Sequence, residues 1–396
     1  MFKWISQTFA VTALSIRTIP QRFGSSAVAL IGIAGVVIVF IAVLSIGEGF
    51  RIAMSDAGKP DRVMVMRKGA DSEMTSGIGG AAADIIKQAP GILMQDNKPV
   101  ASAELYVIID RDKKTTGTAA NVPIRGVEPT VLQVRNEVKI VEGRMFTFGT
   151  NEVIVGKSAM GQFSGLDLNS EIRSGQLTMK IVGVFDAGGS AAESELWTDS
   201  HLIQNVYRRG NSYQSVLLRL DSPSSFQKLS DWLTTNKELE VQVRRESEYY
   251  AAQSETMTAL IKGIGYTIAM LMGLGAIFGA ILTMYTAVAT RTREIATLRA
   301  LGFNTFSVLI SVMGESLALA TIGGLAGGFL AYAAFNGYQT ATMNFQTFSQ
   351  VAFAFRVTPA LLFSALFYAL FMGFLGGIFP AIRAARLPIP SALREL

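Results

Sequence analysis

Residues 25–46 read SSAVALIGIAGVVIVFIAVLSI, an apolar run that contains no charged residue. A helix of this length, rising about 1.5 Å per residue, spans roughly 30 Å, which is the thickness of the hydrocarbon core of a bilayer. Further apolar runs occupy residues 260–289, 306–335 and 358–382, and the third run of the chain contains one acid, Glu315. Because a helix satisfies its own backbone polar groups in lipid, each run predicts one membrane-spanning helix.

The composition supports this prediction. Half of the 396 residues are apolar, only 16% are charged, and the mean hydropathy is +0.36, whereas soluble domains carry about 25% charged residues. The residues between the first two runs have the mixed composition of a folded domain, in which strands outnumber helices. We expect an α-helical membrane domain of four spanning helices, one plus three, with an inserted α+β extracytoplasmic domain.

Within the inserted domain, alternating apolar residues predict strands and short amphipathic stretches predict helices. The predicted strands are residues 61–67, 100–109, 151–155, 179–185 and 215–220, and the predicted helices are residues 81–88 and 226–236. A charged hairpin turn is expected at residues 110–114. We expect one subdomain built from both flanks of the segment and a second subdomain inserted in its middle.

Basic residues gather beside one set of predicted helix ends. They are Lys3, Arg17, Arg22, Arg291, Arg293, Arg299, Arg383, Arg386 and Arg394. Because cytoplasmic flanks are enriched in lysine and arginine, both termini should be cytoplasmic in a bacterial inner membrane, with the large domain outside. The basic balance of the chain is thereby explained at the membrane surface, and no nucleic-acid partner is expected.

The predicted order along the chain has nine parts: a cytoplasmic or interfacial segment, the first spanning helix, the periplasmic domain, the second spanning helix, a cytoplasmic coupling segment, the third spanning helix, a short outer loop, the fourth spanning helix and a cytoplasmic tail. They occupy residues 1–24, 25–46, 47–259, 260–289, 290–305, 306–335, 336–357, 358–382 and 383–396. Aromatic and apolar residues in 1–22 favour an interfacial helix on the inner leaflet over a plain extension of the first span.

Few residues could support catalysis. His201 is the only histidine and cysteine is absent, which excludes a histidine-based metal cluster and disulfides. Gly156-Lys157-Ser158 resembles the end of a phosphate-binding loop, but Asn151 stands where that loop requires its first glycine. We therefore expect no catalytic, cofactor or metal site in this chain.

The spanning helices contain glycines four residues apart. The pairs are Gly323 with Gly327, Gly324 with Gly328, and Gly373 with Gly377. This spacing allows helix backbones to approach closely, either within one subunit or between two. Glu315 is the one ionised group within the spans, and a structural hydrogen-bonding role is favoured over transport chemistry because a proton relay would need more such groups.

Residues 291–302 read RTREIATLRALG and predict a short amphipathic helix between the second and third spans. Its expected apolar side carries Ile295, Leu298 and Leu301. Arg291 and Glu294 are expected to face water with the other arginines. The helix would be a rigid handle between two membrane helices; the alternative is a charged turn that only fixes topology.

In this connector the chain resembles the permeases of the MacB/FtsX-like superfamily of ABC transporters, also called type VII exporters. Their second and third spans are joined by a similar R-x-R-E-I-x-x-L-R-A-L-G segment, which docks into the nucleotide-binding subunit. Other similar stretches are Glu315 followed by Gly323 and Gly327, residues 380–388 and 390–394 near the C-terminus, and residues 125–129, 142–144, 151–156 and 181–184 in the large domain. The resemblance covers nearly the whole chain.

The resemblance implies a non-catalytic permease subunit that couples ATP hydrolysis to movement of its periplasmic domain, in export or extraction of an envelope substrate. It assigns ATPase contact to Arg291, Arg293, Glu294, Ile295, Leu298, Arg299, Leu301 and Gly302. The implied partners are two copies of an ABC ATPase that bind ATP and Mg²⁺, a second permease copy or paralogue, and membrane lipids. A periplasmic adaptor or lipoprotein is left open.

Members of the MacB type carry a fused ATPase ahead of the first span, where this sequence has only residues 1–24. The ATPase is therefore expected to be a separate chain. Two alternatives stay open: an FtsX-like signalling subunit that regulates a cell-wall hydrolase, although such members have a smaller outer domain, and a permease that senses peptide antibiotics.

Overall fold

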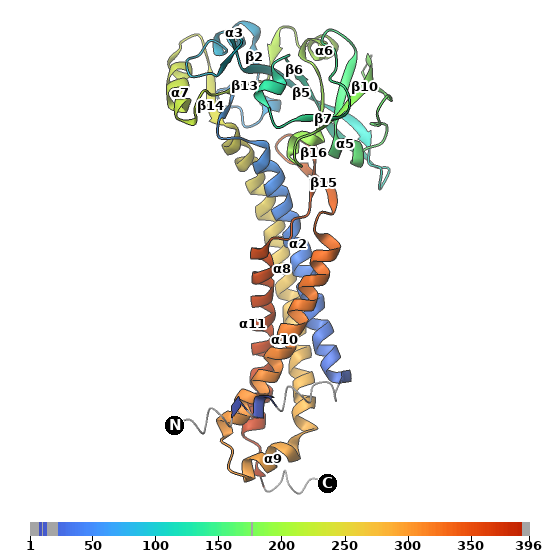
Figure 1. Cartoon of the computed structure of the whole chain (residues 1–396), viewed down its shortest axis with the longest axis vertical. Helices are drawn as coiled ribbons and strands as arrows, with labels where there is room; N and C mark the ends of the chain where they lie inside the picture. The colour runs from blue at the N-terminus through green and yellow to red at the C-terminus, as the bar shows by residue number, and fades with distance from the viewer. Residues whose placement is uncertain (1–7, 10, 14–22, 176, 390–396) are drawn as a thin grey trace. The chain divides into compact units, whose positions relative to one another are not determined.

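The structure is a computed structural model that describes residues 8–9, 11–13, 23–175 and 177–389 (Figure 1). The chain divides into two compact units. The helical unit comprises residues 1–47, 260–337 and 356–396, and the sheet unit comprises residues 48–259 and 338–355. Most of the interfacial helix expected at residues 1–22 lies outside the described residues; residues 8–9 and 11–13 are helical.

Long apolar helices form the helical unit. They are α2 (Phe23–Ala57), α8 (Glu246–Ala289), α10 (Thr305–Phe335) and α11 (Pro359–Ala385), with the short helix α9 (Thr292–Ala300) between α8 and α10. Each of the long helices is long and apolar enough to cross a membrane, which confirms the expectation of four spans. Asn304 and Thr358 cap α10 and α11, because their side chains accept hydrogen bonds from the first-turn amides of Phe306 and Leu361.

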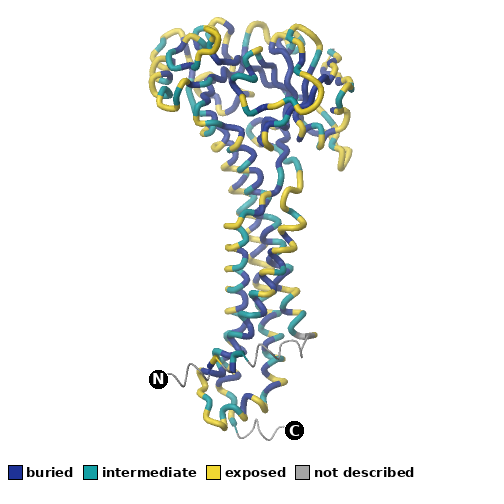
Figure 2. The backbone as a smooth tube through the Cα atoms, in the orientation of Figure 1, coloured by how far each residue is buried: buried dark blue, intermediate teal, exposed yellow. Residues whose placement is uncertain are grey.

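The spanning helices pack through small and branched residues. The core between them includes Ile33, Val37 and Ile41 of α2, Ala320 and Ala331 of α10, and Ala369 and Met372 of α11. Large apolar side chains such as Phe363 and Phe367 are exposed, as expected for helix surfaces that contact lipid. Figure 2 shows buried and exposed residues alternating along each helix.

The sheet unit is built on one ten-stranded mixed sheet with the order β14-β1-β13-β5-β6-β11-β8-β10-β7, and β9 pairs with β10. The strands are β1 (Arg62–Arg67), β5 (Ala101–Asp112), β6 (Ala119–Val127), β7 (Lys139–Gly143), β8 (Glu152–Gly156), β9 (Glu171–Ser174), β10 (Leu177–Asp186), β11 (Leu196–Asp199), β13 (Ser215–Arg219) and β14 (Val241–Arg245). The β6–β11 and β8–β10 pairs are parallel, and the other pairs of the sheet are antiparallel.

Smaller elements complete the sheet unit. The helices are α3 (Gly80–Ile86), α4 (Val131–Val134), α5 (Lys157–Gln162), α6 (Ser200–Val206) and α7 (Phe226–Thr235), and the 3₁₀ turns are η2 (Glu73–Thr75), η3 (Ala191–Ser194) and η4 (Pro223–Ser225). The short strand pairs are β2 (Ile78–Gly79) with β12 (Ser212–Tyr213), and β3 (Met94–Gln95) with β4 (Lys98–Pro99). Apolar residues of α3, α6 and α7 pack on the sheet in one continuous core.

The five predicted strands and both predicted helices of this domain are present, with shifted ends. The flanking strands form one end of the sheet and the inserted strands form the other, so the two expected subdomains share one sheet through β5. The hairpin turn predicted at residues 110–114 is present but shifted to residues 113–118, because β5 continues to Asp112, which pairs with Ala119 of β6. Charged residues at 110–112 can extend the strand because they are not buried there.

The segment between α10 and α11, expected to be a short outer loop, forms a β-hairpin. Its strands are β15 (Gln339–Asn344) and β16 (Ser349–Ala354), which pair antiparallel along their whole length. The hairpin belongs to the sheet unit, whereas α10 and α11 belong to the helical unit.

Candidate functional site

The connector between α8 and α10 forms the predicted helix, and a glycine defines its end. Gly302 has a φ of +94°, a conformation that glycine adopts without the steric cost of a side chain. The Gly302 amide donates to the carbonyl of Arg299, and the Phe303 amide donates to the carbonyl of Leu298, each at 3.1 Å. These two bonds form a Schellman motif, which stops α9 after Ala300.

Arg291 binds the intramembrane acid. Arg291 Nη1 lies 3.2 Å from Glu315 Oε2, and Arg291 Nε lies 2.9 Å from Glu294 Oε2. Arg291 is 9% exposed and Glu315 is 5% exposed, so the expectation that Arg291 faces water is wrong. The physical reason is that a buried carboxylate in α10 needs a counter-charge, and the nearest one comes from the beginning of the connector.

The apolar side expected for α9 is only partly present. Ile295 is buried with Val308 and Val312 of α10, and Leu298 is half-buried. Leu301 is 73% exposed, contrary to the prediction, because the helix ends at Ala300 and the chain turns away at the following glycine. The exposed face of α9 carries Arg293, Glu294 and Leu301.

Two other segments bind the same end of α10 and α9. Arg299 donates a hydrogen bond from Nη1 to the carbonyl of Leu387, which follows α11. Near the N-terminus, Thr8 Oγ1 lies 3.0 Å from Ser307 Oγ, and Ser311 Oγ donates to the Val11 carbonyl at 3.3 Å. The connector is therefore bound to the segment after α11, and the beginning of α10 is bound to residues near the N-terminus.

The glycine pairs of α10 contact two different helices of the same chain. A Cβ on Gly323 would lie 3.1 Å from the Leu30 carbonyl oxygen, and one on Gly327 would lie 2.6 Å from the Ala34 carbonyl oxygen, both in α2. Gly324 faces α11, where its Cβ would lie 2.8 Å from Ala369 Cβ. Four-residue spacing thus brings α10 close to α2 on one side and to α11 on the other.

The remaining predicted glycines also lie at this α10–α11 contact. A Cβ on Gly328 would lie 3.6 Å from Leu362, and one on Gly377 would lie 2.7 Å from Ser316 Cβ. The Ser316 hydroxyl donates to the carbonyl of Gly373 at 2.6 Å. These glycines therefore pack against helices of the same chain.

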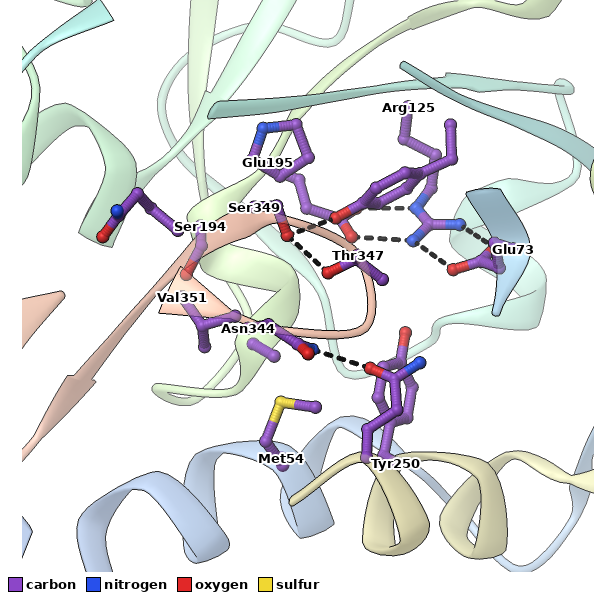
Figure 3. Close-up of a pocket in the computed structure, with 15 residues that line it drawn as sticks. Met54, Glu73, Arg125, Ser194, Glu195, Tyr250, Asn344, Thr347, Ser349 and Val351 are labelled. Carbon is purple, nitrogen blue, oxygen red and sulfur yellow. Dashed lines mark hydrogen bonds and ion pairs between the residues drawn. The ribbon is translucent and has the colours of Figure 1, made fainter. Parts of the chain in front are cut away.

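Sequence reasoning missed a buried ion network in the sheet unit. Arg125 of β6 is 1% exposed and contacts three carboxylates, Glu73 at 2.6 Å, Glu104 at 2.9 Å and Glu195 at 2.7 Å. Figure 3 shows the pairs with Glu73 and Glu195. Arg135 also pairs with Glu104. Burial opposes ionisation of Glu104, but the guanidinium groups of Arg135 and Arg125 outweigh it, and the pKa of Glu104 lies below its usual value.

The network connects segments that are distant in the sequence. Its residues come from η2, β5, β6, the residue after α4 and the segment before β11, and the Ser215 hydroxyl of β13 also donates to Glu73 at 2.7 Å. Within the described ranges, no group of histidine, aspartate and glutamate residues is arranged to hold a metal ion. The arrangement is suited to fixing the mutual position of these segments.

Comparisons with known proteins match both parts of the chain. A family model described as MacB-like periplasmic core domain matches residues 26–236, and one described as FtsX-like permease C-terminal matches residues 266–389. The macrolide export ATP-binding/permease protein MacB of Hyphomonas neptunium is 24% identical over 416 residues, covering 98% of this chain and 61% of that protein. The chain thus spans about three-fifths of the length of that relative.

Another relative is similar over nearly its full length. The uncharacterized ABC transporter permease YvrN of Bacillus subtilis is 22% identical over 394 residues, covering 92% of this chain and 93% of that protein. Among solved structures, the periplasmic region of MacB from Actinobacillus actinomycetemcomitans is 12% identical with a TM-score of 0.36, covering 51% of this chain and 92% of that one. The extracellular domain of the transporter YknZ is 16% identical with a TM-score of 0.35, covering 46% and 99%.

Proposed function

Because the chain belongs to the family of MacB/FtsX-like ABC transporter permeases, we propose that it transmits ATP hydrolysis by a separate ATPase to its extracytoplasmic sheet unit. Membership of this family implies an ATPase partner and dimerisation. The helical unit is the membrane part, and the sheet unit contains residues 48–236 of the segment matched by the periplasmic core domain. The connector around α9 would receive the ATPase, and movement would pass from there through the spanning helices to the outside.

The observation that carries the proposal is the exposed end of a firmly held helix. Leu301 is 73% exposed at the end of α9, while Arg291 and Arg299 bind α10 and the tail after α11. In this position Leu301 offers apolar surface that a bound ATPase would remove from water. A force applied to α9 would pass to α10 through the Arg291–Glu315 ion pair and the buried Ile295.

The remaining parts of the proposal depend on this contact. We place α9 and both termini in the cytoplasm, where two ATPase copies would bind ATP and Mg²⁺, with a second permease copy or a paralogue completing the assembly. The relative named ABC transporter permease, of which the chain covers 93%, supports an ATPase on a separate chain. The task performed outside would be export or extraction of an envelope substrate, aided in some assemblies by a periplasmic adaptor or lipoprotein.

The test is Leu301→Ala, with Phe329→Ala as its matched control. Phe329 of α10 is 72% exposed, as Leu301 is, but lies within a spanning helix. Loss of an exposed anchor residue should weaken binding of the ATPase about tenfold and lower permease-stimulated ATP hydrolysis, because such anchors contribute more than about 1 kcal/mol each. Binding is measured by titrating the purified ATPase onto the permease in nanodiscs.

F329A should bind the ATPase as the parent protein does. If L301A also bound with unchanged affinity and supported full stimulation, α9 would not be the ATPase contact. Insertion of both variants is checked by yield and by monodispersity after purification.

A further inference from the structure

Several hydrogen bonds attach the β15–β16 hairpin to the rest of the sheet unit. The Tyr106 hydroxyl donates to Ser349 Oγ at 2.8 Å, Asn121 Nδ2 to the Phe348 carbonyl at 2.7 Å, the Ala352 amide to Ser194 Oγ at 2.8 Å, and Asn344 Nδ2 to Gln253 Oε1 at 2.8 Å. Figure 3 shows Thr347 and Ser349 of the hairpin near Arg125 and Glu195, and Asn344 nearer to Met54. The Arg125 guanidinium lies 5.0 Å from the ring centroid of Tyr106, so Tyr106 links the hairpin to the ion network.

A small polar cavity lies beneath the hairpin. Its volume is about 20 Å³, and its lining includes Gln253 of α8 and Gln350 of β16. A single water molecule needs roughly 10–15 Å³ of such space and two to four polar partners. The cavity has room for one water.

Two buried amide atoms at this cavity have no partner among the described residues. They are Nε2 of Gln253, which is 4% exposed, and Oε1 of Gln350, which is 8% exposed. The first is a donor and the second is an acceptor. One water can accept from Gln253 and donate to Gln350, which satisfies both atoms at once.

The hydrogen-bond network fixes the orientation of the Gln253 amide. The backbone amide of Gln346 donates to Asn344 Oδ1 at 3.0 Å, so the other atom of that side chain is the donor Nδ2. Asn344 Nδ2 then donates to Gln253 Oε1, which leaves Gln253 Nε2 for the cavity. The unpaired donor is therefore assigned by its neighbours.

We propose that one buried water bridges Gln253 and Gln350 and joins the hairpin to α8. Gln253 lies on the helix that continues into the second membrane span, and the hairpin continues into α10 and α11 at its two ends. The expected consequence rests on the proposed function. The water-bridged contact would make the α8 span and the α10–α11 pair move together on the extracytoplasmic side.

The test uses the absence of cysteine in the chain. Ser194 is 1% exposed under β16. The thiol of an S194C variant therefore reacts with a maleimide only when the hairpin detaches from the rest of the sheet unit. Labelling is measured on the full-length permease without ATPase or nucleotide, so the result does not depend on the coupling proposed above. The thiol of S102C, in the core of β5, reports unfolding of the whole domain.

The decisive change is Gln350→Met in the S194C background, because methionine preserves length but removes the acceptor. With a bridging water, Q350M removes the acceptor to which that water donates and breaks the link to the hairpin, so S194C labelling should become about fivefold faster. With an empty cavity, Q350M would remove an unsatisfied acceptor, and labelling would be unchanged or slower. Either of those results overturns the proposal.

Two controls complete the experiment. Gln339→Met alters an exposed glutamine at the beginning of the hairpin and should leave S194C labelling unchanged. S102C should stay unreactive in the presence of Q350M, which shows that only the hairpin has moved. A map of the full chain at about 2 Å should contain one water density within hydrogen-bond distance of both glutamines, and an empty cavity in that map would refute the site.

Discussion

In the sheet unit, Arg125 lies buried among three glutamates, whereas the residues buried between the spanning helices are mainly glycines, alanines and branched side chains. The sheet unit has a large apolar core, so its charges can be used to align segments. The spanning helices gain no hydrophobic energy from leaving lipid for each other, and close backbone approach provides their attraction. The same kind of change should therefore have different effects in the two units.

The largest expected effect is that of Arg125→Met. It leaves the carboxylates of Glu73, Glu104 and Glu195 without their shared cation, so the free energy of unfolding should fall by at least about 3 kcal/mol. Urea titration followed by tryptophan fluorescence measures it, because Trp197 donates to Glu195 Oε2 at 2.8 Å and reports on this network.

The matched control is Lys157→Met, which removes an ion pair at the surface. Lys157 Nζ lies 3.2 Å from Asp186 Oδ2 with 58% of its side chain exposed, and its loss should change stability by less than about 0.5 kcal/mol. If R125M and K157M lowered the free energy of unfolding by the same amount, the buried network would contribute no more to stability than a surface ion pair.

A smaller effect is expected for Gly327→Ala in the helical unit. The new methyl group would lie 2.6 Å from the Ala34 carbonyl oxygen, so α2 and α10 must separate, at a cost of about 1–3 kcal/mol. Gly275→Ala on α8 is the control, because a Cβ there meets nothing within 4 Å among the described residues. The melting temperature in detergent should fall for G327A only; a fall of the same size in G275A would contradict close packing as the cause.

The smallest effect is expected at an exposed pair of the sheet unit. Hydrogen bonds from Arg144 and from the Thr147 amide lower the pKa of Glu152 to about 2, from a usual value of 4.5. Since the folded-state pKa is the lower one, the pair stabilises the fold above about pH 4.5, and this contribution is lost as the pH falls towards 2. Glu152→Gln should therefore show a shallower loss of stability over that pH range, measured by urea titration, and an unchanged slope would exclude the pair as its source.

The sequence was sufficient for the features that depend on local composition. The apolar runs, the strands and the end of α9 at Gly302 can be derived from residue type and spacing. The Arg291–Glu315 pair could not be predicted in this way, because helical periodicity places Arg291 on the water side and says nothing about an acid on the following helix. Nothing in the sequence around Arg125 distinguishes a buried arginine from one at a strand edge.

The β15–β16 hairpin differs from these cases, because a signal was present. Residues 349–354 read SQVAFA, an alternating stretch consistent with a strand. The short length of the segment between two spanning helices nevertheless favours a loop. The polar seat of the hairpin depends on Tyr106, Ser194 and Gln253, which are distant in sequence and carry no shared motif.

Because Gly302 ends α9, the number of residues before it determines the direction in which Leu301 points around the helix axis. Each residue added to a helix turns the later residues by about 100° around its axis, so one extra residue between Arg291 and Leu301 would rotate the exposed leucine to another side of the helix. A residue added after Gly302 would lengthen the turn without rotating α9. Insertions and deletions should thus be tolerated less well before Gly302 than after it. Homologous connectors can be aligned from that glycine towards the N-terminus.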